Sequence, residues 1–272
     1  MIFNNTSILA KQIRIHALKM TSNAKASHIG SCLSMAELLA VLYQDILRVK
    51  CETPDWEDRD RFILSKGHGA AIYYAVLAEK GFIPKEWLST YAENDSKLSA
   101  HVNSYNIPGI EVSSGSLGHG LPIACGMALA AKASKKNYKI YVLLSDGELD
   151  EGSNWESILF AAHHKLSNLT AIVDYNKIQG FGDVKDILNL EPLEDKFKAF
   201  GWSAVRIDGH NIQEIHNSLS ELPMENDRPT VIIADTIKGK SVSFMEDSLK
   251  WHYRSPSSDE LKKAISEIEK TQ

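Results

Sequence analysis

The sequence predicts an α/β fold: a parallel sheet flanked by helices on both faces. Helical patterns and short apolar runs alternate from end to end, and the runs have the length and composition of strands. Strands that alternate with helices imply parallel βαβ units. Since no low-complexity linker or repeat divides the chain, we expect one domain over residues 1–272.

The apolar pattern indicates where the first elements lie. We expect a helix over about residues 6–22, and a second from Ser34, as N-cap with Glu37 three positions on, to about Leu47. The buried face of the first would comprise Leu9, Ile13, Ala17 and Met20. Five strands are expected, at residues 61–64, 140–144, 169–173, 204–207 and 230–234.

The other helices follow glycine-rich turns or typical punctuation. One follows the turn at residues 65–69, and another starts at Leu121. A helix near residues 192–200 has Pro192 in its first turn and Gly201 just past its end. Residues 83–115 hold few periodic apolar residues, and loops this long in compact domains are usually functional or disordered.

A capping box is expected at the helix after the second central strand. Ser153 would be its N-cap and Glu156 its third residue. The buried stripe of this helix would comprise Trp155, Leu159, Ala162 and Leu166.

Composition excludes several classes of protein. With 43% hydrophobic and 24% charged residues among 272, the chain should bury a sizeable core. A net charge of −5 gives no sign of a nucleic-acid surface. The longest apolar run, residues 121–131, is too short to span a membrane, and no signal peptide is visible. Three widely spaced cysteines form no disulfide framework, which favours the cytoplasm.

Two polar residues carry the strongest indication of chemistry. Asp146 and Asn176 lie on loops that follow the strands at 140–144 and 169–173. If those strands are parallel neighbours, both loops emerge at the same carboxyl edge, where open α/β sheets bind ligands. A carboxylate, an amide and backbone carbonyls suit a hard cation, Mg²⁺ or Ca²⁺, which takes substrate phosphates as further ligands. The residues therefore predict a site for a metal-bridged diphosphate.

Five segments, taken in order, resemble the N-terminal half of transketolases, which binds the diphosphate of the cofactor. They are Ser27–Gly30, Leu64–Gly69, Gly115–Gly120, Ser145–Gly147 with Asn176, and Lys238–Ser241 with His252. The resemblance covers essentially the whole chain and implies the thiamine diphosphate-binding fold of the PP type. Ser145 stands where the family motif has glycine, and the surroundings of His101 match the family only in the histidine.

The resemblance implies a role for each matched residue. Asp146, Asn176 and the carbonyl of Ile178 would hold the metal ion. The cofactor would be bound by His68, Gly115, Ser116, Leu117, Gly147, Glu148, Asn176 and His252. His28, His101 and His252 would bind sugar hydroxyls and move protons, since neutral imidazole both donates and accepts. Glu151 and Glu156 would relay protons near a dimer interface, although Glu156 fits a helix cap equally well.

The implied activity is transfer of a two-carbon ketol unit from a ketose phosphate to an aldose. The chain ends where a full transketolase begins its pyrimidine-binding half, so the resemblance implies the N-terminal component of a split enzyme. The expected assembly is a heterotetramer with two copies of this chain and two of its partner.

Other interpretations of the sequence stay open at this point. One is another thiamine enzyme, similar to deoxyxylulose-phosphate synthase or to a dehydrogenase α-subunit. A further one is a non-catalytic half-enzyme. A nucleotide-binding dehydrogenase is disfavoured, because the glycines at 115, 118 and 120 do not have the spacing of GxGxxG and follow no clear strand.

Overall fold

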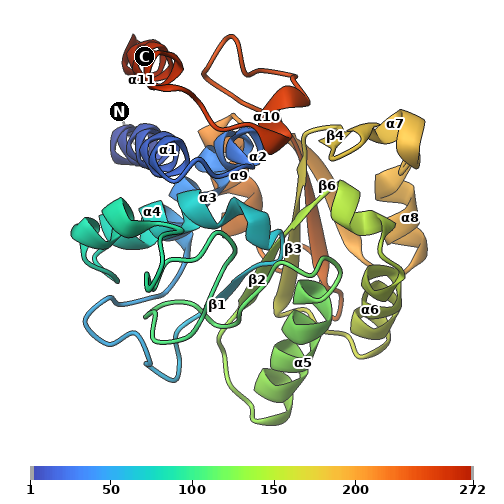
Figure 1. Ribbon diagram of the computed structural model, residues 1–272. Helices are drawn as coiled ribbons and strands as arrows, with labels where there is room; N and C mark the ends of the chain where they lie inside the picture. The colour runs from blue at the N-terminus through green and yellow to red at the C-terminus, as the bar shows by residue number, and fades with distance from the viewer. Residues whose placement is uncertain (1–2, 271–272) are drawn as a thin grey trace.

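A five-stranded parallel sheet forms the centre of the protein, as the computed structural model of residues 3–270 describes it (Figure 1). Residues 1–2 and 271–272 of the expected domain lie outside the described residues. In spatial order the strands are β1 (Arg61–Leu64), β2 (Ile140–Ser145), β3 (Leu169–Tyr175), β7 (Thr230–Asp235) and β6 (Ser203–Asp208). All four pairings are parallel. The expected strands and fold class are confirmed.

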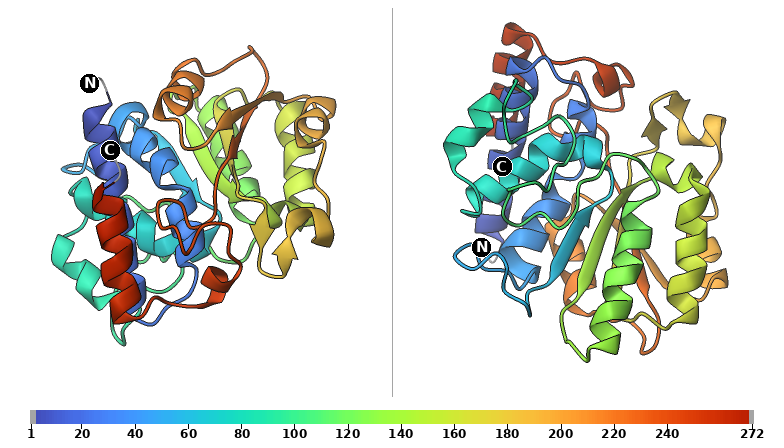
Figure 2. Two further views of the ribbon diagram at one scale, coloured as in Figure 1. Left: turned by 90° about the horizontal axis from the view of Figure 1, so that it is seen from above. Right: turned by 60° about the horizontal axis from the view of Figure 1, so that its bottom comes forward.

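Helices cover both faces of the sheet, and successive strand residues serve opposite faces. Leu143 packs in one apolar cluster, whereas Val142 and Leu144 pack in the other. The first cluster is covered by α1 (Asn4–Asn23), α2 (Ile29–Ser34), α3 (Ala36–Val41), α4 (Ala70–Glu79), α9 (Ile212–Ser220) and α11 (Ser258–Lys270). The second is covered by α5 (Gly120–Ala133), α6 (Gly152–His163) and α8 (Leu193–Ala199). Figure 2 shows α11 lying beside α1, so the two ends of the chain close one flank together.

Shorter elements surround the carboxyl edge of the sheet. The turn after β1 is a 3-10 helix, Gly67–Gly69, and another 3-10 helix, Gly147–Asp150, follows β2. A small hairpin of β4 (Ile178–Gln179) and β5 (Gly182–Asp183) follows β3 and leads into α7 (Val184–Ile187). The last is α10 (Lys250–Tyr253). None of the described helices is long and apolar enough to cross a membrane.

The long excursion is present and packs into the core. A 3-10 helix, Lys85–Thr90, is its one helical turn, and irregular backbone then leads to α5. Leu98, Val102 and Ile107 on this irregular path are buried in the first apolar cluster. The expected first helix is also confirmed, with its apolar stripe buried.

The capping box expected at Ser34 is wrong. Ser34 ends α2, Met35 interrupts the helix, and α3 resumes at Ala36 before a π-helical turn over Leu42–Ile46. The Ser34 hydroxyl instead donates to a buried carboxylate oxygen of Asp174, 2.6 Å away. A buried charged acceptor binds a hydroxyl more strongly than a backbone N–H does, so tertiary contact outweighs capping here.

The capping box at Ser153 is wrong for a similar reason. The helix α6 begins one residue earlier, at Gly152, and Ser153 donates to the carbonyl of Gly118 at 2.7 Å. Leu159, expected in the buried stripe, is 59% exposed, and Phe160 beside it is 39% exposed. The buried face of α6 comprises Asn154, Ser157, Ile158 and Ala161.

A buried ion pair on the first face carries a prediction about acid stability. Burial alone would raise the pKa of Glu37, but Arg14, whose two nitrogens lie 2.5 Å from its oxygens, and His210 lower that pKa to about 2. The stabilisation is present above pH 4.5, the value for a free glutamate, and is lost as the pH falls toward 2.

We expect Glu37→Gln to lower the free energy of unfolding by about 3 kcal/mol at pH 7. Urea titrations should show that the gap between wild type and variant shrinks by about half at pH 3. A gap of equal size at both pH values would show that Glu37 is not the titrating group.

Candidate functional site

The two predicted ligands meet at the carboxyl edge of the sheet. Ser145 at the end of β2 is level with Asp174 in β3, so the loops that follow emerge side by side. One carboxylate oxygen of Asp146 accepts a hydrogen bond from the Lys177 backbone N–H at 2.5 Å, and the other accepts from Gly147 at 2.7 Å. Asp146, Asn176 and Ile178 line one cavity of about 250 Å³.

The electrostatics of Asp146 fit a cation. This carboxylate is 1% exposed, and burial, with the charge of Asp174, raises its pKa to about 6. A buried anion of this kind is stabilised by a cation in its cavity. No group of three or more His, Cys, Asp or Glu side chains within residues 3–270 is arranged to hold a metal ion. The oxygen set of carboxylate, amide and carbonyl is therefore the donor set that the cavity offers, and it suits Mg²⁺ or Ca²⁺.

A buried lysine adds positive charge to the same cavity. Lys238, 2% exposed, donates to the carbonyl of Ile178 at 2.7 Å, and its ammonium lies 3.1 Å from Nδ1 of His252. Burial lowers the pKa of Lys238 to about 8, and the charge of Asp146 opposes that shift. The lysine therefore stays largely cationic at neutral pH, as an anionic ligand beside it requires.

Four predicted histidines form one cluster. His28 lies within ring contact of His68, His101 and His252, at centroid distances of 5.0, 5.9 and 4.8 Å. His28 holds a left-handed backbone conformation (φ +71°), and its N–H donates to the carbonyl of His252. Its Nδ1 is buried and makes no hydrogen bond within the described residues, so it remains available to a ligand.

These imidazoles are held neutral. Burial is the first cause, and it lowers the pKa of His28 to about 4 and that of His252 to about 3. The charge of Lys238 lowers both further, and burial with Lys66 lowers the pKa of His68 well below its usual value. A neutral imidazole offers one donor and one acceptor, so the cluster can bind hydroxyl groups and pass protons.

The glycine-rich loop before α5 runs tightly against the turn after β1. A Cβ on Gly67 would stand 2.4 Å from the backbone of Ser114, and one on Gly115 would stand 2.9 Å from the ring of His101. Leu117 lines the cavity, whereas Ser116 does not line it. The loop thus brings backbone close to His68 and His101, where a bulkier residue would collide.

Three predicted acidic residues lie outside the cavity lining. Glu148 is fully buried and accepts from Ser65, at 2.5 Å, and from the N–H of Gly118, at 2.9 Å, so it ties two loops together from behind. Glu151 is exposed at the start of α6. Glu156 lines a separate groove between α5 and α6.

A buried ion pair holds the segments around the cavity together. Lys66 and Asp174 are both fully buried, with nitrogen and oxygen 2.5 Å apart. Asp174 also accepts from Ser34 and from Thr236, and Lys66 donates to the carbonyl of Ser31 at 3.2 Å. The Ser31 hydroxyl in turn lies 3.1 Å from Nε2 of His68.

Several residues around the cavity have no counterpart among the sequence-based predictions. They are Ser31, Ser145, Gln179, Gly180, Phe181, Lys238 and Tyr253. Ser31 and Lys238 lie in or beside segments that the sequence marks, but chain distance does not reveal which side chains turn inward. The hairpin residues 179–181 follow Ile178 directly, and that proximity was the available signal.

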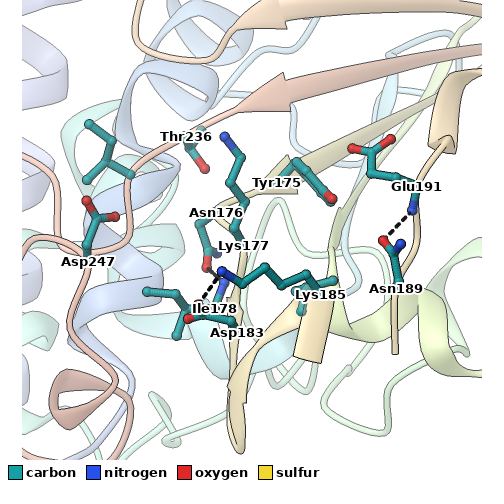
Figure 3. Close-up of a pocket in the computed structure, with 12 residues that line it drawn as sticks. Tyr175, Asn176, Lys177, Ile178, Asp183, Lys185, Asn189, Glu191, Thr236 and Asp247 are labelled. Atoms are coloured by element: carbon teal, nitrogen blue, oxygen red, sulfur yellow. Dashed lines mark hydrogen bonds and ion pairs between the residues drawn. The ribbon is translucent and has the colours of Figure 1, made fainter. Parts of the chain in front are cut away.

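A larger cavity of about 520 Å³ lies across the Asn176–Ile178 loop (Figure 3). Both cavities share Asn176 and Ile178 as lining residues. The larger one is lined by charges of both signs, among them Lys185, which lies 3.5 Å from Asp183. The loop that would hold the metal ion is therefore a thin wall between two cavities.

Comparison with known proteins gives consistent matches over nearly the whole chain. The family model described as "Transketolase, thiamine diphosphate binding domain" matches residues 5–268. One of the named subunits of the apulose-4-phosphate transketolase of Actinobacillus succinogenes is 45% identical over 260 residues, which cover 95% of this chain and 94% of that protein. The 6-deoxy-6-sulfo-D-fructose transketolase subunit of a Clostridium species is 41% identical, covering 96% and 95%.

Solved transketolases share the fold. The Campylobacter jejuni enzyme superimposes with a TM-score of 0.93 at 31% identity, covering 99% of this chain and 43% of that one. The chain thus spans about two fifths of the length of that transketolase.

Proposed function

Because the chain belongs to the transketolase family, as its thiamine diphosphate-binding domain, we propose that it is the N-terminal subunit of a split transketolase. In this proposal it transfers a two-carbon ketol unit from a ketose phosphate to an aldose, together with a separate pyrimidine-binding subunit. The observation that carries the proposal is the convergence of Asp146 and Asn176 on one cavity beside four histidines.

The residues of the cavity fit the diphosphate end of the cofactor and its metal ion. Asp146, Asn176 and the carbonyl of Ile178 would hold Mg²⁺ or Ca²⁺. His68, Ser31 and Lys238 would donate to the diphosphate, while Gly147 and the loop of residues 115–117 would approach it with backbone. Glu148 would act from behind the cavity by fixing these loops.

Bound thiamine diphosphate supplies an electron sink for cleavage of the ketose C2–C3 bond. The residues of this chain would bind and orient the sugar and exclude water from it. Neutral His28, His101 and His252 would accept protons from sugar hydroxyls and return them as the bond breaks and forms. Since His252 is adjacent to Lys238 and its Nδ1 faces the ammonium, its Nε2 would be the nitrogen available to the sugar.

An exposed apolar face supports assembly with other chains. Ile123 on α5 and Leu159 and Phe160 on α6 are 38%, 59% and 39% exposed, beside the groove that Glu156 lines. Among the described residues, no atom lies within 4 Å of the point where a Cβ on Gly126 would stand. Apolar side chains next to an open helical glycine favour close packing against another chain.

We infer a heterotetramer with two copies of this chain and two of its partner, in which this face is covered. Glu151 and Glu156 would then lie near the interface, where they could relay protons between sites. The free cysteines, two of them buried, favour a reducing cytoplasm.

The decisive experiment assays this chain and its purified pyrimidine-binding partner separately and then mixed. We expect ketol transfer from a ketose phosphate with Mg²⁺ and thiamine diphosphate only in the mixture, with light scattering giving the mass of the heterotetramer. Transfer by this chain alone would refute the split enzyme, and an inactive mixture would favour a non-catalytic half-enzyme.

A further inference from the structure

Tyr253 forms one wall of the cofactor cavity at its mouth. It follows His252 directly and lines the same cavity, yet it is 60% exposed. Its ring lies 4.7 Å from that of His252. The four rings of His101, His28, His252 and Tyr253 therefore run in sequence, each in contact with the next.

The tyrosine is anchored rather than free. Its hydroxyl donates to the carbonyl of Gly180 at 2.7 Å, which joins α10 to the β4–β5 hairpin on the other side of the cavity. An exposed side chain loses rotamer freedom when it is held in this way, so its position is defined at the mouth.

Gly180 and Tyr253 are matched in shape. A Cβ on Gly180 would stand 3.0 Å from the tyrosine hydroxyl and 3.4 Å from Nε2 of His252. The aromatic side chain thus fills space that a side chain at position 180 would take. Phe181, 82% exposed, continues the wall on the hairpin.

We propose that Tyr253 is a specificity-determining residue that limits the length of the ketose donor. This inference rests on the proposed function. The row of histidines would bind the reacting end of the sugar, and Tyr253 at its end stands where the rest of the sugar leaves the cavity. The metal ligands lie on other segments, so removing the ring enlarges the sugar site and leaves the grip on the diphosphate unchanged.

The test uses the mixture of this chain with its partner and compares two donors, four-carbon erythrulose and six-carbon fructose 6-phosphate. We expect Tyr253→Ala to raise the ratio of kcat/KM for the long donor over the short one by about tenfold, a typical effect of relieving a steric limit in a pocket. Tyr253→Phe keeps the ring and should leave the ratio within about twofold. Tyr105→Ala is the matched control, because Tyr105 is a 77% exposed tyrosine that lines neither of these two cavities.

A second readout separates a sugar role from a cofactor role. Trp251 is buried next to His252, so its fluorescence should report thiamine diphosphate binding to this chain without turnover. We expect the Kd of Tyr253→Ala to equal that of wild type. An unchanged donor ratio, or a weakened Kd that accounts for the whole effect, would overturn the proposal. Wild-type mixtures inactive toward both donors would instead count against the proposed function itself.

Discussion

Asp146→Asn should lower ketol transfer by about a thousandfold or more, because the metal ion that neutralises a diphosphate loses its charged ligand. The variant keeps the shape of the side chain and one carbonyl oxygen. In equilibrium binding experiments, thiamine diphosphate with Mg²⁺ should bind this chain far more weakly than it binds wild type. Asp186→Asn, an exposed carboxylate on α7, is the matched control and should bind normally.

The same substitution should stabilise the ligand-free protein. Burial raises the pKa of Asp146 from 3.8 to about 6, so charging this group costs folding free energy as the pH rises through that interval. At pH 7 the cost is fully present, and Asp146→Asn should increase the free energy of unfolding by up to about 3 kcal/mol. Loss of function with a gain in stability identifies a ligand; loss of both would mean that Asp146 is only structural.

Lys66→Met should destabilise the protein by about 3–5 kcal/mol, because it leaves Asp174 charged and buried without its cation. Thermal unfolding should show a fall in Tm of about 10 °C. The effect should reach the cavity as well, since Asp174 is joined to Ser34 and Thr236 and stands two residues before Asn176.

A double variant tests the mechanism of that effect. Lys66→Met with Asp174→Asn removes both charges and should be more stable than Lys66→Met alone by at least about 1 kcal/mol. Lys165→Met breaks an exposed ion pair with Asp227 and should change stability by no more than about 0.5 kcal/mol. Strict additivity of the two single variants would exclude a coupled pair.

Most of the sheet could be predicted from the sequence because the pattern is local. Each strand is a short apolar run, and the order of helices and strands along the chain implies parallel pairing. The convergence of Asp146 and Asn176 follows from that pairing alone, since both residues come directly after neighbouring strands.

What the sequence could not reveal depends on partners distant in the chain. Ser34 and Ser153 have the spacing of helix caps, but each hydroxyl donates to a tertiary acceptor that local reasoning does not contain. Lys238 and Tyr253 enter the cavity from segments that return to it about 60 and 70 residues after Ile178 and Gly180. Periodicity alone places Leu159 in the core, because it cannot distinguish a core face from a face that another chain covers.

The parallel sheet has a consequence for how the protein acquires its binding site. Arg61 pairs with Ile140, and Thr170 pairs with Thr230, so every ladder closes a long loop, and such topologies fold slowly. The cavity draws on segments from Ser31 to Tyr253, and no fragment shorter than that span contains it. A nascent or proteolysed chain therefore has no partial affinity for its coenzyme, and coenzyme added during refolding rewards only molecules that have completed the sheet.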